Sequence, residues 1–85
     1  MRYELTDLRL FLEIAQAGSL TAGASAVFIT PSAASYRLKN LEQAMGTPLF
    51  ERTARQPRLT AAGEAFLPRA RNLLIELNKA SVMAT

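Results

Sequence analysis

The sequence of 85 residues contains no cysteine, no histidine and no tryptophan. Without cysteine the chain cannot form a disulfide or a zinc–thiolate site. Without histidine it also lacks the commonest metal ligand and the commonest general base. The seven acidic residues are scattered along the chain and form no cluster. We therefore expect no metal, no cofactor, no catalytic residue and no enzymatic activity.

Long apolar runs are absent as well. No segment approaches the ~20 apolar residues that a membrane span requires. The charged N-terminus has no apolar stretch of the kind found in secretory signals. The sequence therefore predicts no membrane association and a cytoplasmic, nucleoid-associated location. A chain this short forms one domain with a small core, so we also expect a partner chain.

The basic residues are unevenly distributed. Residues 1–29 contain two basic and three acidic side chains, whereas residues 30–71 contain seven basic and three acidic ones. This asymmetry, with a pI near 10.0, favours a polyanionic partner. A basic surface that serves only solubility is the alternative, and the position of the charges in the fold must decide between the two.

Apolar periodicity and capping residues predict two helices at the start of the chain. The first is expected over residues 7–17, with Thr6 as its N-cap. The second is short, begins at a cap on Ser19 or Thr21 and ends near Phe28.

A third helix is expected from Pro31 to about Met45. Thr30 is its predicted N-cap, Pro31 suits the first helical position, and Gly46 ends the helix. At about 100° per residue the helix has two distinct faces. The core face carries Ala34, Leu38, Leu41 and Met45, and the opposite face carries Ser32, Ser35, Tyr36, Lys39 and Gln43, with Glu42 to one side.

The polar face of this third helix suits the DNA major groove. Short hydroxyls bond to base edges or phosphates, a phenol contacts sugar or phosphate, and an ammonium group pairs with a phosphate. An ordinary solvated helix face is the alternative. The preceding short helix and sharp turn favour the DNA interpretation, because helix, turn and helix form a helix-turn-helix motif.

After this helix the sequence predicts a two-stranded wing. The strands are expected at about 49–52 and 58–60, and a pair this small must pack on the helices. Arg52, Arg55 and Arg58 lie on or beside the connecting loop, where they suit a phosphate backbone. Arginines that serve only solubility are again the alternative.

The last segment, residues 60–85, is expected to be helical. Its apolar stripe is longer than the small core requires, which indicates a partner helix. Packing on the chain's own helices is the alternative, and Pro68 is compatible with a kink or with two abutting helices. The residues expected at a dimer interface are Phe66, Leu67, Ala70, Leu73, Leu74 and Leu77.

The fold class predicted from these elements is mostly α. A winged helix-turn-helix, with a three-helix core and a two-stranded wing, occupies residues 1–59. A long dimerisation helix follows over residues 60–85.

Several runs of residues resemble the N-terminal domain of LysR-type transcriptional regulators over roughly residues 5–75. They are Phe11 with Gly18-Ser19-Leu20-Thr21, Thr30-Pro31-Ser32-Ala33-Ala34-Ser35, Gly46-Thr47-Pro48-Leu49-Phe50-Glu51-Arg52, and Leu59-Thr60-Ala61-Ala62-Gly63. The resemblance implies a winged helix-turn-helix followed by a linker helix that pairs two subunits.

The resemblance also implies roles for individual residues. Pro31, Ser32, Ser35 and Tyr36 fall at the base-contacting start of the recognition helix, and Arg52, Arg55 and Gln56 fall in the wing. The full set of expected DNA contacts is Thr30, Pro31, Ser32, Ser35, Tyr36, Lys39, Arg52, Arg55, Gln56 and Arg58. The chain departs from the family pattern at four positions. They are Pro31 for the frequent Gln, Tyr36 for the frequent Arg, Ala34 for a larger aliphatic residue and Gly23 for Ala.

We therefore expect sequence-specific binding of double-stranded DNA by a homodimer, on a roughly palindromic operator. The resemblance implies that a small-molecule effector acts only through a C-terminal domain, which this chain does not include, so we expect a fragment of a longer regulator. The main alternative is a protein-interaction module in which the last helix is the functional element and the basic face is only solvated.

Overall fold

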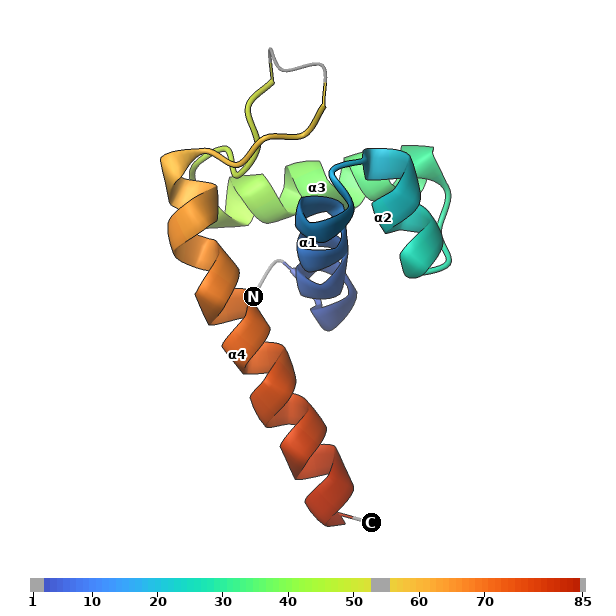
Figure 1. Cartoon of the computed structure of the whole chain (residues 1–85), viewed down its shortest axis with the longest axis vertical. Coiled ribbons are helices and arrows are strands. Elements are labelled where there is room, and N and C mark those ends of the chain that lie inside the picture. The colour runs from blue at the N-terminus through green and yellow to red at the C-terminus, as the bar shows by residue number, and fades with distance from the viewer. Residues whose placement is uncertain (1–2, 53–55, 85) are drawn as a thin grey trace.

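The computed structural model describes residues 3–52 and 56–84, with side chains up to residue 80. Its helices are α1 (Leu5–Ala17), α2 (Leu20–Ala26), α3 (Pro31–Met45) and α4 (Ala61–Ala84). The first three form the body of the molecule, and α4 projects from it as a rod (Figure 1). The mostly helical fold class predicted from the sequence is confirmed.

Helix α1 begins at Leu5, two residues before the predicted start, because its N-cap is Glu4 and the prediction of Thr6 was wrong. A capping box joins Glu4 to Asp7, and the backbone N–H of Glu4 donates to Oδ2 of Asp7 at 2.8 Å. Such reciprocal bonds satisfy donors that the first helical turn leaves free.

Helix α2 is capped by Ser19, whose hydroxyl accepts the N–H of Ala22 at 3.1 Å. It ends at Ala26, two residues before the predicted end, because Phe28 adopts a positive φ of 62° that breaks the helix. The phenyl side chain of Phe28 is 95% exposed. A non-glycine residue in this conformation is strained, and here it forms the turn between α2 and α3.

Helices α1 and α2 approach closely at Gly23. A Cβ atom at this position would lie 2.5 Å from Cγ1 and 2.9 Å from Cα of Ile14. The small residue is therefore required for the packing of the two helices.

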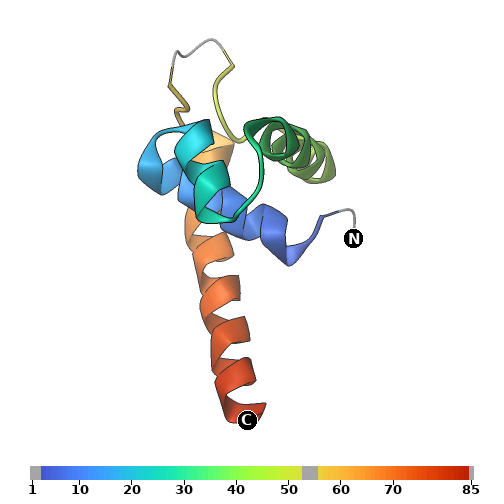
Figure 2. The ribbon, with the colours of Figure 1, turned by 90° about the vertical axis from the view of Figure 1, so that its right-hand side faces the viewer.

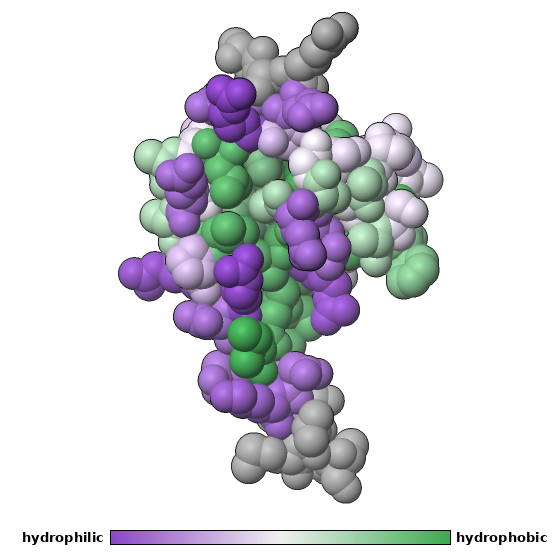
Figure 3. All heavy atoms as spheres, in the orientation of Figure 1, coloured by the Kyte–Doolittle hydropathy of each residue, from purple (hydrophilic) through white to green (hydrophobic). Residues whose placement is uncertain are grey.

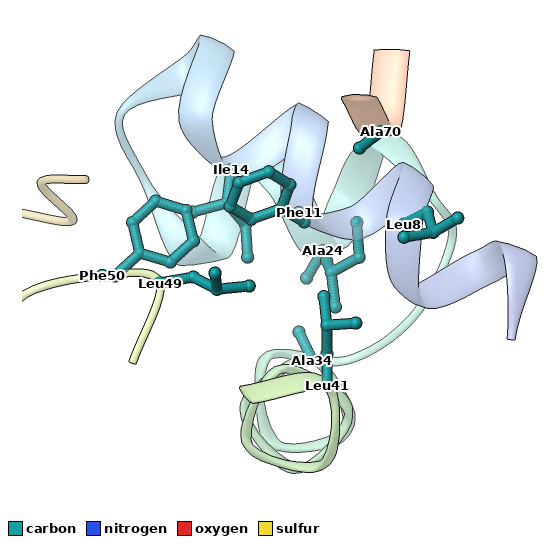
Figure 4. Packing of buried hydrophobic residues seen from close by; sticks show 10 residues of the cluster. Leu8, Phe11, Ile14, Ala24, Ala34, Leu41, Leu49, Phe50 and Ala70 are labelled. Atoms are coloured by element: carbon teal, nitrogen blue, oxygen red, sulfur yellow. The ribbon is translucent and has the colours of Figure 1, made fainter. Parts of the chain in front are cut away.

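The core lies where the three body helices meet the start of α4 and the base of the wing (Figure 4). Phe11 is at its centre, with ring centroids 5.4 Å from Phe50 and 5.3 Å from Phe66. The buried hydrophobic residues are Leu8, Leu10, Phe11, Ile14, Ala24, Ala34, Leu41, Leu49, Phe50 and Ala70.

The wing is smaller than predicted. Among the described residues, the expected strands at 49–52 and 58–60 reduce to a single antiparallel bridge between Phe50 and Leu59. The N–H of Glu51 donates to the carbonyl of Arg58 at 2.7 Å, and that of Thr60 donates to the carbonyl of Leu49 at 3.0 Å. Pro57 lies two residues before the bridged Leu59, and proline is tolerated in sheets mainly at strand ends and edges.

Helix α4 is one continuous helix with Pro68 inside it, so the alternative of two abutting helices is wrong. The hydroxyl of Thr60 accepts the N–H of Gly63 at 3.0 Å and donates to the carbonyl of Pro48 at 2.7 Å. The first turns of α4 pack against α1, and the remainder extends away from the body (Figure 2).

Candidate nucleic-acid interface

Helix α3 has the bounds that the sequence predicts, Pro31–Met45. The hydroxyl of Thr30 accepts the N–H of Ala33 at 3.1 Å, and Gly46 ends the helix with a φ of 77°. Strong local signals therefore determine where this helix begins and where it ends.

The two faces of α3 are also those predicted. Ala34 and Leu41 are buried, and Leu38 and Met45 pack against the core. On the opposite face all five predicted side chains are exposed, namely Ser32, Ser35, Tyr36, Lys39 and Gln43. Thr30 and Pro31 are exposed at the start of the helix as well. Their roles as DNA contacts remain predictions.

An ion pair joins α3 to α1. Nη1 of Arg37 donates to Oδ1 of Asp7 at 3.0 Å, and the Asp7 side chain is almost fully buried. The other carboxylate oxygen of Asp7 accepts the N–H of Glu4. One side chain therefore caps α1 and also holds the second turn of α3, a role that sequence reasoning missed.

A second acidic residue joins α3 to the base of the wing. Glu42, which the sequence placed to one side of the helix, is buried. Its Oε2 accepts the N–H of Leu49 at 2.7 Å and that of Phe50 at 3.2 Å. Its Oε1 lies 3.7 Å from Nη2 of Arg52. The wing is thus fixed relative to α3 by a charged acceptor, which makes stronger hydrogen bonds than a neutral one.

The wing residues expected to contact DNA are exposed where the structure describes them. These are Arg52, Gln56 and Arg58, and Arg55 lies outside the described residues. Ser35, Arg52 and Gln56 border one hollow between α2, α3 and the wing, and Lys39, Gln43 and Arg52 border another. The structure therefore brings the polar face of α3 and the basic wing together.

Comparison with known proteins identifies the arrangement. Residues 5–64 match the family model of the bacterial regulatory helix-turn-helix proteins of the lysR family. The chain belongs to the LysR family.

One relative of this LysR domain is the uncharacterized HTH-type transcriptional regulator YbhD of Escherichia coli K12. The two are 38% identical over 74 residues, which cover 87% of this chain and 23% of YbhD. The chain spans about a quarter of the length of several curated relatives that it matches. The family is one of transcriptional regulators and not of enzymes.

Solved structures share the fold of the LysR domain. The DNA-binding domain of CbnR, in a complex with DNA, superimposes with a TM-score of 0.88 at 32% identity, over 95% of this chain and 93% of that one. The DNA-binding domain of BenM, in a complex with benA site 1 DNA, gives 0.90 at 31% identity over 95% and 91% of the two chains. The winged helix fold of these DNA-binding domains is therefore also the fold of this chain.

The expected dimer residues of this LysR domain fall into two groups. Phe66 and Leu67 pack against the core. Ala70 is completely buried in the domain itself, and its expected contact with a partner stays a prediction. Its position facing α1 explains the burial, since the first turns of α4 are part of the body.

The second group lies on the projecting half of the helix. Leu73 and Leu77 are 52% and 48% exposed, and Leu74 is half-buried. Leu74 and Leu77 border a shallow hollow together with Leu5 and Arg9 of α1. Figure 3 shows the hydrophobic side chains on this face as a band that runs from the body onto α4 between hydrophilic margins.

The described part of the LysR domain offers no other site of obvious chemistry. It contains no group of three or more acidic, histidine or cysteine side chains that could hold a metal ion. Of the helices that the structure describes, none combines the length and hydrophobicity required to cross a bilayer.

Proposed function

We propose that this LysR domain binds duplex DNA, with the first turns of α3 in the major groove and the wing along the phosphate backbone. One observation carries this proposal. The exposed polar face of α3 and the exposed arginine of the wing border the same hollows, so a single duplex can contact both. The similarity of the fold to the CbnR and BenM domains, which were solved in complexes with DNA, supports it.

The side chains divide between two tasks. We assign phosphate neutralisation to Lys39, Arg52, Arg55 and Arg58, and an uncharged hydrogen bond to the backbone or minor groove to Gln56. Such contacts set affinity and orientation without reading sequence. We assign contacts with base edges to Pro31, Ser32, Ser35 and Tyr36, with Thr30 as a further DNA contact at the start of the helix, because the N-terminal residues of a recognition helix enter the groove.

The proposal includes a homodimer formed through the projecting half of α4. Leu73 and Leu77 expose apolar surface that pairing with a second copy would remove from water. A two-fold dimer implies a roughly palindromic operator, with half-sites one helical turn or more apart. We further propose that a small-molecule effector would act only through a separate domain, and that the protein acts in the cytoplasm at the nucleoid.

Fluorescence anisotropy of a labelled duplex at two salt concentrations tests this function. We expect affinity to fall steeply with salt, because bound phosphates release counterions. Arg52→Ala should weaken binding to all sequences alike and reduce the slope of the salt dependence by about one.

Arg69→Ala is the matched control, since Arg69 is exposed on α4, nine residues beyond Thr60 at the base of the wing. It should leave the affinity and the slope close to those of the wild type. If folded protein binds no duplex even at low salt, the protein-interaction module becomes the better account of this chain.

A further inference from the structure

The first two turns of α3 expose an unusual set of side chains for a helix that reads bases. Discrimination of guanine or adenine in the major groove relies mainly on long side chains with two hydrogen-bonding atoms, such as arginine, asparagine or glutamine. The exposed side chains in these turns are instead two serines, a proline and a tyrosine, which are Pro31, Ser32, Ser35 and Tyr36. The hydroxyl of Thr30 is engaged in capping the helix.

The arginine in this part of the helix points elsewhere. Arg37 is held by Asp7 at 3.0 Å, on the side of α3 that faces α1. Asp7 is itself fixed by its bond to the N–H of Glu4, so the carboxylate end of the pair is anchored. Reaching a guanine would require Arg37 to leave a nearly buried carboxylate without its partner, which is costly.

The two amides of α3 are also poorly placed to read bases at the start of the helix. Asn40 is half-buried and borders a hollow together with Glu4, Asp7 and Arg37. Tyr36 borders this hollow as well, but it is largely exposed, whereas Asn40 is not. Gln43 lies in the last part of the helix, in the hollow shared with Pro48 and Arg52 of the wing. That position is beside the expected path of the phosphate backbone.

Tyr36 is therefore the largest side chain available to the groove. It is 69% exposed and lies one turn after Ser32 on the same face of α3. Among the described residues, none makes a hydrogen bond to its hydroxyl group. An aromatic ring in the major groove complements one base feature in particular, the C5-methyl group of thymine, which accepts apolar contacts.

We propose that Tyr36 reads thymine methyl groups, so that the half-site is selected by apolar contact more than by hydrogen bonds to purines. This inference rests on the proposed function, because it assigns a role within the same groove-facing surface. It makes Tyr36 a specificity-determining residue. The neighbouring serine hydroxyls can donate or accept, so they bond to different base edges without strong preference.

Uracil substitution tests the inference directly, because deoxyuridine lacks only the methyl group and keeps every hydrogen-bonding atom of thymine. The preferred site is first selected from random duplexes with the wild-type chain. Each thymine of the site is then replaced in turn, and the dissociation constant is measured by anisotropy. We expect one or two thymines per half-site at which the substitution weakens binding about fourfold, the value for one buried methyl group.

The variants assign this sensitivity to a residue. Tyr36→Phe keeps the ring and should keep the response to uracil at those positions, whereas Tyr36→Ser should lose it. Because Tyr36 is exposed, both variants should fold, and circular dichroism checks this. Uracil at thymines outside the half-sites is the control and should have no effect.

The outcomes separate this inference from the proposed function. Absence of salt-sensitive binding by the wild type would overturn the proposed function. Binding with no preferred site, with a site lacking sensitive thymines, or with sensitivity that persists in Tyr36→Ser would overturn the inference and leave DNA binding intact.

Discussion

Oδ1 of Asp7 and Nη1 of Arg37 lie 3.0 Å apart across the contact between α1 and α3. Asp7 also belongs to the capping box of α1, so the end of one helix and the orientation of another depend on the same carboxylate. An exposed ion pair contributes little to stability, but here one partner is almost fully buried and makes a second hydrogen bond.

Removal of this carboxylate should therefore destabilise the domain. We expect Asp7→Ala to lower the free energy of unfolding by about 1–3 kcal/mol, because a cap and a charged hydrogen bond are both lost. Urea denaturation followed by circular dichroism measures the change. Glu76→Ala is the control, since Glu76 forms an exposed pair with Lys79, and it should have little effect. Equal stability of the two variants would contradict the structural role of Asp7.

The buried carboxylate of Glu42 provides a second prediction. Glu42→Gln keeps the shape of the side chain but replaces the charged acceptor of the Leu49 and Phe50 N–H groups with a neutral one. We expect a loss of about 1–2 kcal/mol in stability. DNA affinity should fall as well, because the bonds that hold the wing on α3 become weaker. Glu51→Gln, at an exposed position of the wing, should leave stability within about 0.5 kcal/mol of the wild type.

A substitution in the turn between α2 and α3 should raise the stability of the domain. Phe28 has a φ of 62° and is almost fully exposed, so its side chain makes little contribution to packing. Phe28→Gly should raise the free energy of unfolding by up to ~1 kcal/mol, since glycine adopts this conformation without strain.

Phe28→Ala separates the backbone effect from the loss of the ring. Alanine keeps the steric restriction on φ and removes the aromatic surface, so it should not stabilise the domain. If alanine stabilised it as much as glycine, strain at this turn would not be the cause. Thermal denaturation of the wild type, Phe28→Gly and Phe28→Ala measures the three stabilities.

The projecting half of α4 provides a prediction about assembly. Leu73→Glu with Leu77→Glu should yield monomers, because charges replace the apolar surface proposed to pair with a second copy. Sedimentation equilibrium measures the mass, and Asn72→Glu, at a polar position of the same helix, should leave dimers intact. Dimers that survive the double substitution would refute the assignment of the interface to these residues.

Much of this fold follows from local signals in the sequence. Helix α3 was predicted with both bounds correct, because Thr30, Pro31 and Gly46 are strong and adjacent start and stop signals. The start of α1 was missed because its cap is a reciprocal pair of acids, not the hydroxyl of Thr6. The wing was predicted as two short strands, but its described residues form one bridge, because strand propensity does not show how many residues pair.

The site residues show the same division. Exposure of Ser32, Ser35 and Tyr36 follows from helical periodicity, which the sequence displays directly. The roles of Asp7 and Glu42 do not, because the partner of Asp7 lies thirty residues away and those of Glu42 are backbone N–H groups of another segment. Only the packed chain brings these groups together. Ala70 was expected at a dimer interface because the apolar stripe of α4 carries no signal of where its packing on α1 ends.

The junction at Thr60 has a mechanical consequence. Its hydroxyl bonds to the carbonyl of Pro48, and Gly63 lies against the carbonyl of Leu49, so the base of the wing is clamped to the first turn of α4. The first turns of α4 also pack against α1 as far as the buried Ala70, so the clamp and the core hold the start of the helix together. Residues 71–84 then extend the rod by about 21 Å, at 1.5 Å per residue. The projecting rod and the base of the wing therefore share one attachment to the body, and the direction of the rod is set by the same contacts that set the position of the wing.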